Sequence, residues 1–291
     1  MASLKEVKLR IQSVKSTRKI TSAMKMVASS KLHHAQQRIE NLRPYAQTIS
    51  RILACFNATL DENFTTPLAS ERPVKRVCLV VFTSNSSLCG AFNSTIIKNL
   101  KHQVEAFAHQ QIEIYKVYAF GKKALEACRK LNLSDVVDCC TLVDHPNYES
   151  TAQIAHDIMH LYLSKDIDAC HVLYHHFKSS AVQIYTNEQY LPLKTIDSNA
   201  PQAESVNNNF YIVEPSPEEV MAVLLPKVLN LQLYTKLLDS VASEHAARII
   251  AMQVATDNAD ELLNQLQLQY NKGRQAAITA ELLDIVGGSM A

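Results

Sequence analysis

The chain has 291 residues, 47% of them hydrophobic and 20% charged, with a formal net charge of +1. These values are ordinary for a globular protein, and no apolar run approaches the roughly 20 residues that a membrane-spanning helix needs. Only five residues are glycine, which favours long helices because an interior glycine destabilises a helix by about 1 kcal/mol. The seven cysteines show no CxxC spacing, so neither a disulfide framework nor a zinc site is indicated.

The first segment carries a seven-residue repeat of apolar residues. Of its 16 positions 13 are apolar, and the other three are Arg18, Thr21 and Lys25. The repeat predicts a left-handed coiled-coil helix over residues 1–57, in which Pro44 causes a kink rather than an end. The apolar positions are Leu4, Val7, Ile11, Val14, Ala28, Leu32, Ala35, Ile39, Leu42, Ala46, Ile49, Leu53 and Phe56.

The last segment predicts a partner helix over residues 216–287. It begins with a capping serine, a proline and a glutamate three residues after the cap, and it ends at two glycines. If both helices leave one domain and run antiparallel, paired positions sum to about 274, so Lys25 faces about Ile249 and Ser3 about Asn271. The final dozen residues then extend roughly 20 Å beyond the pair.

This overhang is largely apolar. An apolar helix end that projects past its own coiled coil is expected to lie inside a partner. Its apolar residues are Ala277, Ile278, Leu282, Leu283, Ile285 and Val286.

The middle segment, residues 75–195, alternates short apolar strands with helices. This order predicts an α/β domain with a mostly parallel sheet. The stretch 182–191 is expected to form an edge strand, and the polar stretch 196–210 a surface loop. The expected strands are 77–82, 112–120, 136–140 and 170–174, and the expected helices are 93–108, 122–131 and 151–165.

No motif indicates catalysis by this chain. The loop 83–90 follows a strand and precedes a helix, but it has one glycine and no Lys-Ser or Lys-Thr end, so we interpret it as a structural turn. His171, His175 and His176 gather near a strand end without a third convergent ligand, so they are interpreted as ordinary histidines and no metal is expected.

Charge is distributed unevenly. Residues 1–57 hold 11 basic and 2 acidic residues, whereas residues 217–291 hold 5 and 9. A basic helix is compatible with a solvated face, an acidic protein partner or nucleic acid. Two alternatives therefore stay open at this point: an α/β enzyme that dimerises through its long helices, and a coiled-coil nucleic-acid binder.

Both ends of the chain carry a resemblance to one family. Residues 11–28 resemble the N-terminal helix of ATP synthase gamma subunits, and residues 243–248, 255–259 and 270–288 resemble their C-terminal helix. The resemblance implies an antiparallel terminal coiled coil around a Rossmann-like α/β domain. It also implies a non-catalytic rotor without cofactors, which couples ion flow through the c-ring to ATP synthesis or hydrolysis at the beta subunits.

The partners implied by this resemblance are three alpha and three beta subunits, the epsilon subunit, the delta-containing complex and the membrane c-ring. Nucleic acid and direct membrane insertion are not expected. The absence of a transit peptide favours a bacterial chain, peripheral on the cytoplasmic side of the inner (plasma) membrane.

The resemblance also assigns contact residues between rotor and stator. The apolar overhang is implied to enter a hydrophobic sleeve at the top of the ring. Asn85-Ser86-Ser87 replace the family's usual Asp-Arg-Gly, and Gly273 replaces a usual alanine, which weakens the helix locally. The implied contact residues are Met24, Lys25, Arg248, Arg274, Gln275, Thr279 and Glu281.

Overall fold

The computed structural model describes residues 4–59, 66–193, 214 and 216–289. The chain divides into two compact units, one formed by residues 1–30 with 248–291 and the other by residues 31–247. Two long helices contribute to both units, α1 (Leu4–Thr59) and α6 (Pro217–Ser289). The three-part division with boundaries at 57, 75, 195 and 216 stays a prediction, and the expected loop 196–210 lies outside the described residues.

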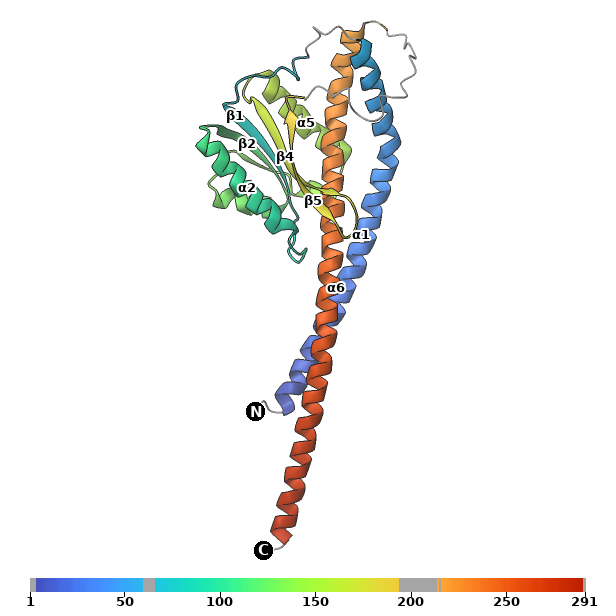
Figure 1. Ribbon diagram of the computed structural model, residues 1–291, viewed down its shortest axis with the longest axis vertical. Helices are drawn as coiled ribbons and strands as arrows, with labels where there is room; N and C mark the ends of the chain where they lie inside the picture. Colours follow the sequence, from blue (N-terminus) through green and yellow to red (C-terminus); the bar gives the residue numbers. More distant parts are fainter. Residues whose placement is uncertain (1–3, 60–65, 194–213, 215, 290–291) are drawn as a thin grey trace. The chain divides into compact units, whose positions relative to one another are not determined.

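A sheet of five strands forms the centre of the unit 31–247, in the order β3-β2-β1-β4-β5 (Figure 1). Neighbouring strands are parallel except β4 and β5, so the predicted mostly parallel sheet is confirmed, with an antiparallel strand at its edge. The bounds are β1 (Arg76–Phe82), β2 (Glu113–Phe120), β3 (Val136–Asp138), β4 (Ala169–Phe177) and β5 (Gln183–Leu191).

Helices cover both faces of this sheet. On one face, α2 and α3 bury aliphatic side chains of β1, β2 and β4, with Ile96, Leu100 and Cys128 fully inaccessible. On the other face lie α5 and the first third of α6, which are joined by a hydrogen bond between His156 and Asn230. The bounds are α2 (Phe92–His109), α3 (Lys122–Lys130), α4 (Thr141–Asp144) and α5 (Tyr148–Leu163).

The turn from β2 into α3 requires a glycine. Gly121 has φ +102°, and a Cβ there would lie 2.3 Å from the carbonyl oxygen of Thr83. The Thr83 hydroxyl donates to the Phe120 carbonyl and accepts from the Ala124 amide at 2.8 Å. These bonds join the carboxyl ends of β1 and β2 to the start of α3, where no space is left for a side chain.

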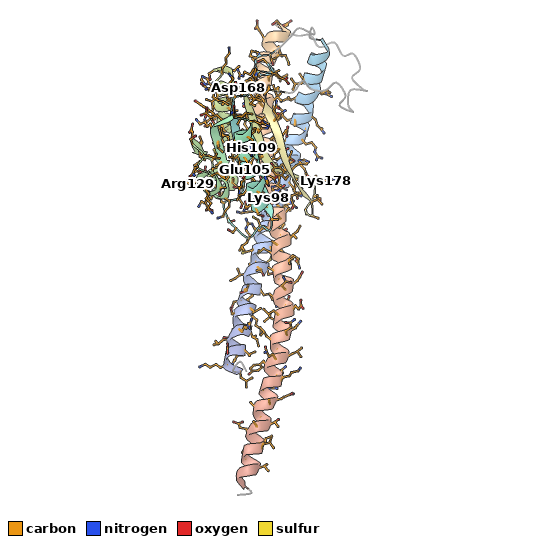
Figure 2. All side chains as sticks on the ribbon, turned by 60° about the vertical axis from the view of Figure 1, so that its left-hand side comes forward. Lys98, Glu105, His109, Arg129, Asp168 and Lys178 are labelled. Atoms are coloured by element: carbon orange, nitrogen blue, oxygen red, sulfur yellow. The ribbon has the colours of Figure 1, made fainter. Side chains whose placement is uncertain are left out.

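A buried carboxylate fastens the segment before β1 to the start of β4. Asp168, labelled in Figure 2, accepts hydrogen bonds from the amides of Lys75 and Arg76 at 2.9 Å and pairs with Arg72 at 3.1 Å. Arg72 also stacks over the ring of Tyr162 at 4.2 Å. Burial alone would raise the pKa of Asp168, but the two amide hydrogen bonds and the nearby guanidinium lower it below its usual value.

In the other unit, α1 and α6 pair antiparallel. Lys25 Nζ donates to Gln253 Oε1 at 2.6 Å. Leu4 lies beside Gly273, where a Cβ would be 3.2 Å from Leu4 Cδ2. The expectation that Lys25 faces Ile249 is therefore wrong by one helical turn, and Ser3 lies outside the described residues. Helix α1 extends to Thr59, two residues beyond the expected end, which moves the pairing in the observed direction and accounts for about half of this difference.

Both helices continue through their internal prolines. Pro44 lies within α1, as predicted, and Pro226 within α6. Helix α6 continues to Ser289, one residue past the two glycines that are predicted to end it.

Candidate interaction surfaces

The C-terminal part of α6 is an apolar helix end. Residues 274–289 continue past the level of Leu4, the first described residue of α1, for about 24 Å at 1.5 Å per residue (Figure 1). Ile278, Leu282 and Ile285 share one face of this end and are 49%, 57% and 66% exposed. We call the exposed apolar residues of this end the tip: Ala277, Ile278, Leu282, Leu283, Ile285 and Val286.

Four of the expected contact residues lie on the same helix end. The side chains of Arg274, Gln275 and Glu281 are exposed, and the Thr279 hydroxyl donates to the Gln275 carbonyl at 2.9 Å. These polar side chains lie within about three helical turns of the apolar tip residues. One partner surface can therefore contact the polar side chains and the tip together.

The other three expected residues form a separate group nearer the middle of α6. Met24 and Lys25 are half-buried on α1, and Arg248 is 7% exposed on α6. About 30 Å of helix separates Gln253, which binds Lys25, from Arg274. Because Lys25 uses one of its three N–H groups on Gln253, two remain for another partner.

The three polar positions of the α1 repeat are paired across the coiled coil. Arg18 Nε lies 2.8 Å from Asp260 Oδ1, and the hydroxyls of Thr21 and Thr256 are 2.9 Å apart. Lys25 and Gln253 make the third layer. The sequence did not identify these three partners on α6. The predicted alignment of α1 with α6 differs from the observed one by about one helical turn, so it brings other residues of α6 opposite each position.

The outer side of α1 combines cations with apolar side chains. Lys8, Lys15 and Lys19 are exposed and recur at intervals of seven and four. Leu9 and Ile20 are also exposed, at 58% and 59%. The basic helix predicted from sequence thus presents its charge outward, where an acidic partner can reach it.

The loop after β1 is closed by its own side chains. Ser84 Oγ donates to the Ser86 carbonyl and accepts from Asn93 Nδ2 at 2.7 Å. Asn85 Nδ2 donates to Asp144 Oδ2 at 2.7 Å, and its Oδ1 accepts from the amide of Lys122 at the start of α3. These bonds support the interpretation of the loop as a structural turn and give Asn85 a structural contact.

The histidines of β4 take part in packing and pairing. His175 stacks against Phe92 with ring centroids 4.6 Å apart, and burial lowers its pKa to about 4. His171 lies beside Phe107, and His176 Nδ1 lies 2.7 Å from Asp239 Oδ2. Within the described ranges, no group of three or more His, Cys, Asp or Glu side chains is arranged to hold a metal ion.

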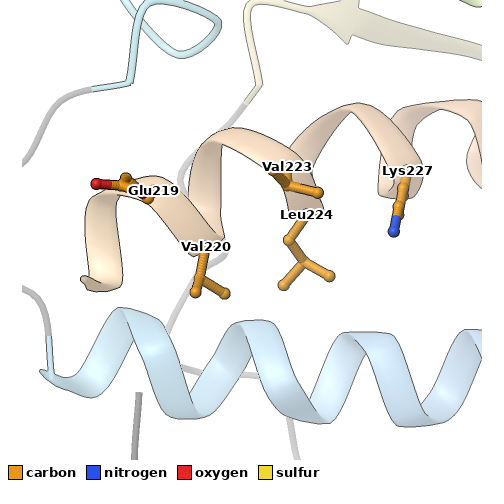
Figure 3. Close-up of a pocket in the computed structure, with 5 residues that line it drawn as sticks. All are labelled: Glu219, Val220, Val223, Leu224 and Lys227. Carbon is orange, nitrogen blue, oxygen red and sulfur yellow. The ribbon is translucent and has the colours of Figure 1, made fainter. Parts of the chain in front are cut away.

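One pocket of about 370 Å³ lies on α6 beside α1 (Figure 3). Val220, Val223 and Leu224 form its apolar part, with Glu219 and Lys227 at the two ends. A single carboxylate and a single ammonium among aliphatic side chains supply no nucleophile with an adjacent base, so the pocket offers no catalytic arrangement.

No helix in the described part of the chain is both long and apolar enough to cross a membrane.

Comparisons with known proteins agree along the whole chain. A family profile described as "ATP synthase" matches residues 3–291. The "ATP synthase gamma chain" of Bacteroides thetaiotaomicron is 51% identical and that of Flavobacterium johnsoniae 44% identical, each over at least 99% of both chains.

Solved structures are similar as well. A chain of the Tetrahymena thermophila mitochondrial ATP synthase "central stalk/cring" structure is 26% identical, with a TM-score of 0.57, over 81% of this chain and 99% of that one. A chain of the Euglena gracilis mitochondrial ATP synthase "OSCP/F1/c-ring" structure has a TM-score of 0.63 over 99% of this chain and 93% of that one. At 20% identity, this second likeness supports the fold alone.

Proposed function

Because the chain belongs to the ATP synthase gamma-chain family, we propose that it is the central-stalk rotor of an F1Fo ATP synthase. It is a non-catalytic subunit that turns inside a ring of alpha and beta subunits. Its rotation couples ion flow through the c-ring to ATP synthesis or hydrolysis at the beta subunits.

The tip of α6 is the observation that carries this proposal. Four of its side chains, Leu282, Leu283, Ile285 and Val286, are each more than half exposed on a helix end that extends past α1. Isolated exposed apolar residues are common, but a cluster on a projecting helix indicates a binding surface. A sleeve formed by a ring of subunits would cover this end from all sides while letting it turn.

The two groups of polar residues then contact the ring at two levels. Arg274, Gln275, Thr279 and Glu281 would contact it beside the tip, whereas Met24, Lys25 and Arg248 would contact it nearer the middle of α6. A rotor can bias the conformations of a partner only if its contacts differ between those conformations. The exposed lysines of α1 meet this requirement if acidic partner groups approach them at some angles of rotation and not at others.

The proposed assembly contains three alpha and three beta subunits, the epsilon subunit, the delta-containing complex and the c-ring. Relatives from Bacteroides and Flavobacterium support a bacterial complex. This chain would then be peripheral, on the cytoplasmic side of the inner membrane.

Reconstitution tests this proposal. The chain is mixed with purified alpha and beta subunits, and co-elution and ATP hydrolysis are measured with and without it. We expect a stable complex that hydrolyses ATP faster when the chain is present, and loss of that effect when the residues after Gly273 are deleted. Gly288→Ala is the matched control, because a Cβ at Gly288 meets no described atom within 4 Å.

Elution of the chain by itself with unchanged hydrolysis would contradict the rotor proposal. Retention of the chain on DNA that is lost as salt rises would instead support the nucleic-acid alternative.

A further inference from the structure

Four polar contacts connect strands β4 and β5 to α6 within the unit 31–247. Lys236 Nζ lies 3.2 Å from Glu188 Oε1, and Asp239 Oδ2 lies 2.7 Å from His176 Nδ1. Two further contacts involve backbone carbonyls: Tyr190 donates to Leu229 at 2.9 Å, and Ser243 donates to His175 at 3.2 Å. We call these four contacts the polar joint.

The joint follows one side of α6. Its residues Leu229, Lys236 and Ser243 recur every seven positions, which is close to two helical turns. Fourteen residues of helix span about 21 Å, so the contacts are distributed along about four turns of α6 rather than concentrated at one point.

The charged members on α6 are buried, and their partners are not. The side chains of Lys236 and Asp239 are 8% and 13% exposed, whereas those of Glu188 and His176 are 45% and 53% exposed. Burial raises the pKa of Asp239 even though His176 and Lys236 both act to lower it, so the surroundings disfavour the ionised carboxylate.

Such buried charges are a poor way to stabilise a domain. Replacement of a buried ion pair by apolar side chains of similar volume often leaves a protein equally stable or more stable. Apolar contacts between a helix and a sheet resist separation, but they are non-directional and resist sliding less. Charge-assisted hydrogen bonds, in contrast, are confined to a narrow range of distances and angles.

We propose that the polar joint is the torque-bearing connection between the α/β domain and α6, and that its residues position the domain on the shaft. The proposal rests on the rotor function, since only a rotor must transmit torque between its domain and its shaft. Lys236, Asp239 and their partners then determine the torsional stiffness of the rotor, separately from the stability of the fold.

The test replaces the buried charges by apolar side chains. Lys236→Met with Asp239→Leu removes two of the four contacts and leaves Glu188 and His176 accessible to water, so no charge is buried without a partner. The matched control is Lys123→Met, which removes an ion pair with Glu126 at 2.9 Å on the surface of α3.

The measurement is the angular fluctuation of a probe on the domain in complexes whose alpha and beta subunits are fixed to a surface. The probe is attached through Lys98→Cys, an exposed position on α2 (Figure 2), in a chain that carries Cys55→Ser. The other six cysteines, Cys78, Cys89, Cys128, Cys139, Cys140 and Cys170, are buried, so they should not react with the probe. Fluctuations are recorded during the dwells that occur at limiting ATP.

We expect the angular variance to rise about twofold in the double variant, because two of four directional restraints are lost. The angular variance of the control and the thermal unfolding midpoint of the double variant should stay unchanged. Unchanged variance in the double variant, or an equal rise in the control, overturns the proposal. If the double variant does not fold, Tyr190→Phe with Ser243→Ala removes the other two contacts and carries the same expectation. Failure of the unmodified chain to assemble or rotate would instead reject the rotor function.

Discussion

The tip of α6 allows a quantitative prediction about assembly. Leu282 and Leu283 are 57% and 67% exposed, so a sleeve can still cover more than half of each side chain. Full burial of a leucine contributes about 1.5–3 kcal/mol, and the shares that remain exposed here correspond to about 2–4 kcal/mol for the pair. Leu282→Ser with Leu283→Ser should therefore raise the dissociation constant for the alpha–beta ring about 30- to 800-fold.

The assay is titration of labelled ring with the variant chain, accompanied by thermal unfolding of the free chain. Unfolding should be unchanged, since both side chains are exposed before assembly. Leu163→Ser is the matched control, because Leu163 is 52% exposed on α5 and has no role in the proposed contact. A double variant that binds within about threefold of the unmodified chain would refute the reasoning, because it would show that the tip is not buried.

Three further predictions concern stability and are measured by chemical or thermal unfolding. Gly121→Ala should destabilise the domain by about 2–4 kcal/mol, through its positive φ and the clash with the carbonyl oxygen of Thr83 after β1, whereas Gly288→Ala should not destabilise the chain. Gly273→Ala should stabilise the chain by up to about 1 kcal/mol, since the added methyl meets only the flexible end of Leu4, at 3.2 Å; a loss of stability would show that Leu4 cannot move. Asp168→Asn should destabilise the domain at neutral pH. Because the folded state lowers the pKa of Asp168, this difference should be full above the unfolded pKa of about 3.9 and disappear as pH falls through the lower folded value; a difference independent of pH would contradict the assignment.

Much of the architecture follows from local signals in the sequence. The apolar repeat of residues 4–56 predicts α1 because a period of 3.5 residues has few other structural solutions. The short apolar runs between helices predict the parallel strands, and the alternating run 182–191 predicts β5 at the edge. Pro44 did not end α1, as the unbroken repeat around it indicated.

The stagger of the two long helices could not be obtained in the same way. It depends on where the two helices first meet, and an error of about one helical turn there moves every facing pair. Arg18 was therefore not matched with Asp260, although each is an obvious partner for the other by charge.

The polar joint was missed for a different reason. Lys236 and Asp239 interrupt an apolar stretch of α6, which is a visible signal of buried polar groups. Their partners Glu188 and His176 lie on strands about 50 residues or more away in the chain, and the chain alone does not show which strand packs on which helix. A polar residue in an apolar stretch of helix thus predicts a buried polar contact, but it does not identify the residue on the other side of that contact.

Direct observation of rotation tests the central claim most directly. Alpha and beta subunits are fixed to a surface, the chain carries a probe at Lys98→Cys on α2, and ATP is added. The rotor function predicts that the probe turns continuously in one direction, and that it stops when ATP is removed. A probe that stays at one angle while the same complexes hydrolyse ATP would contradict it.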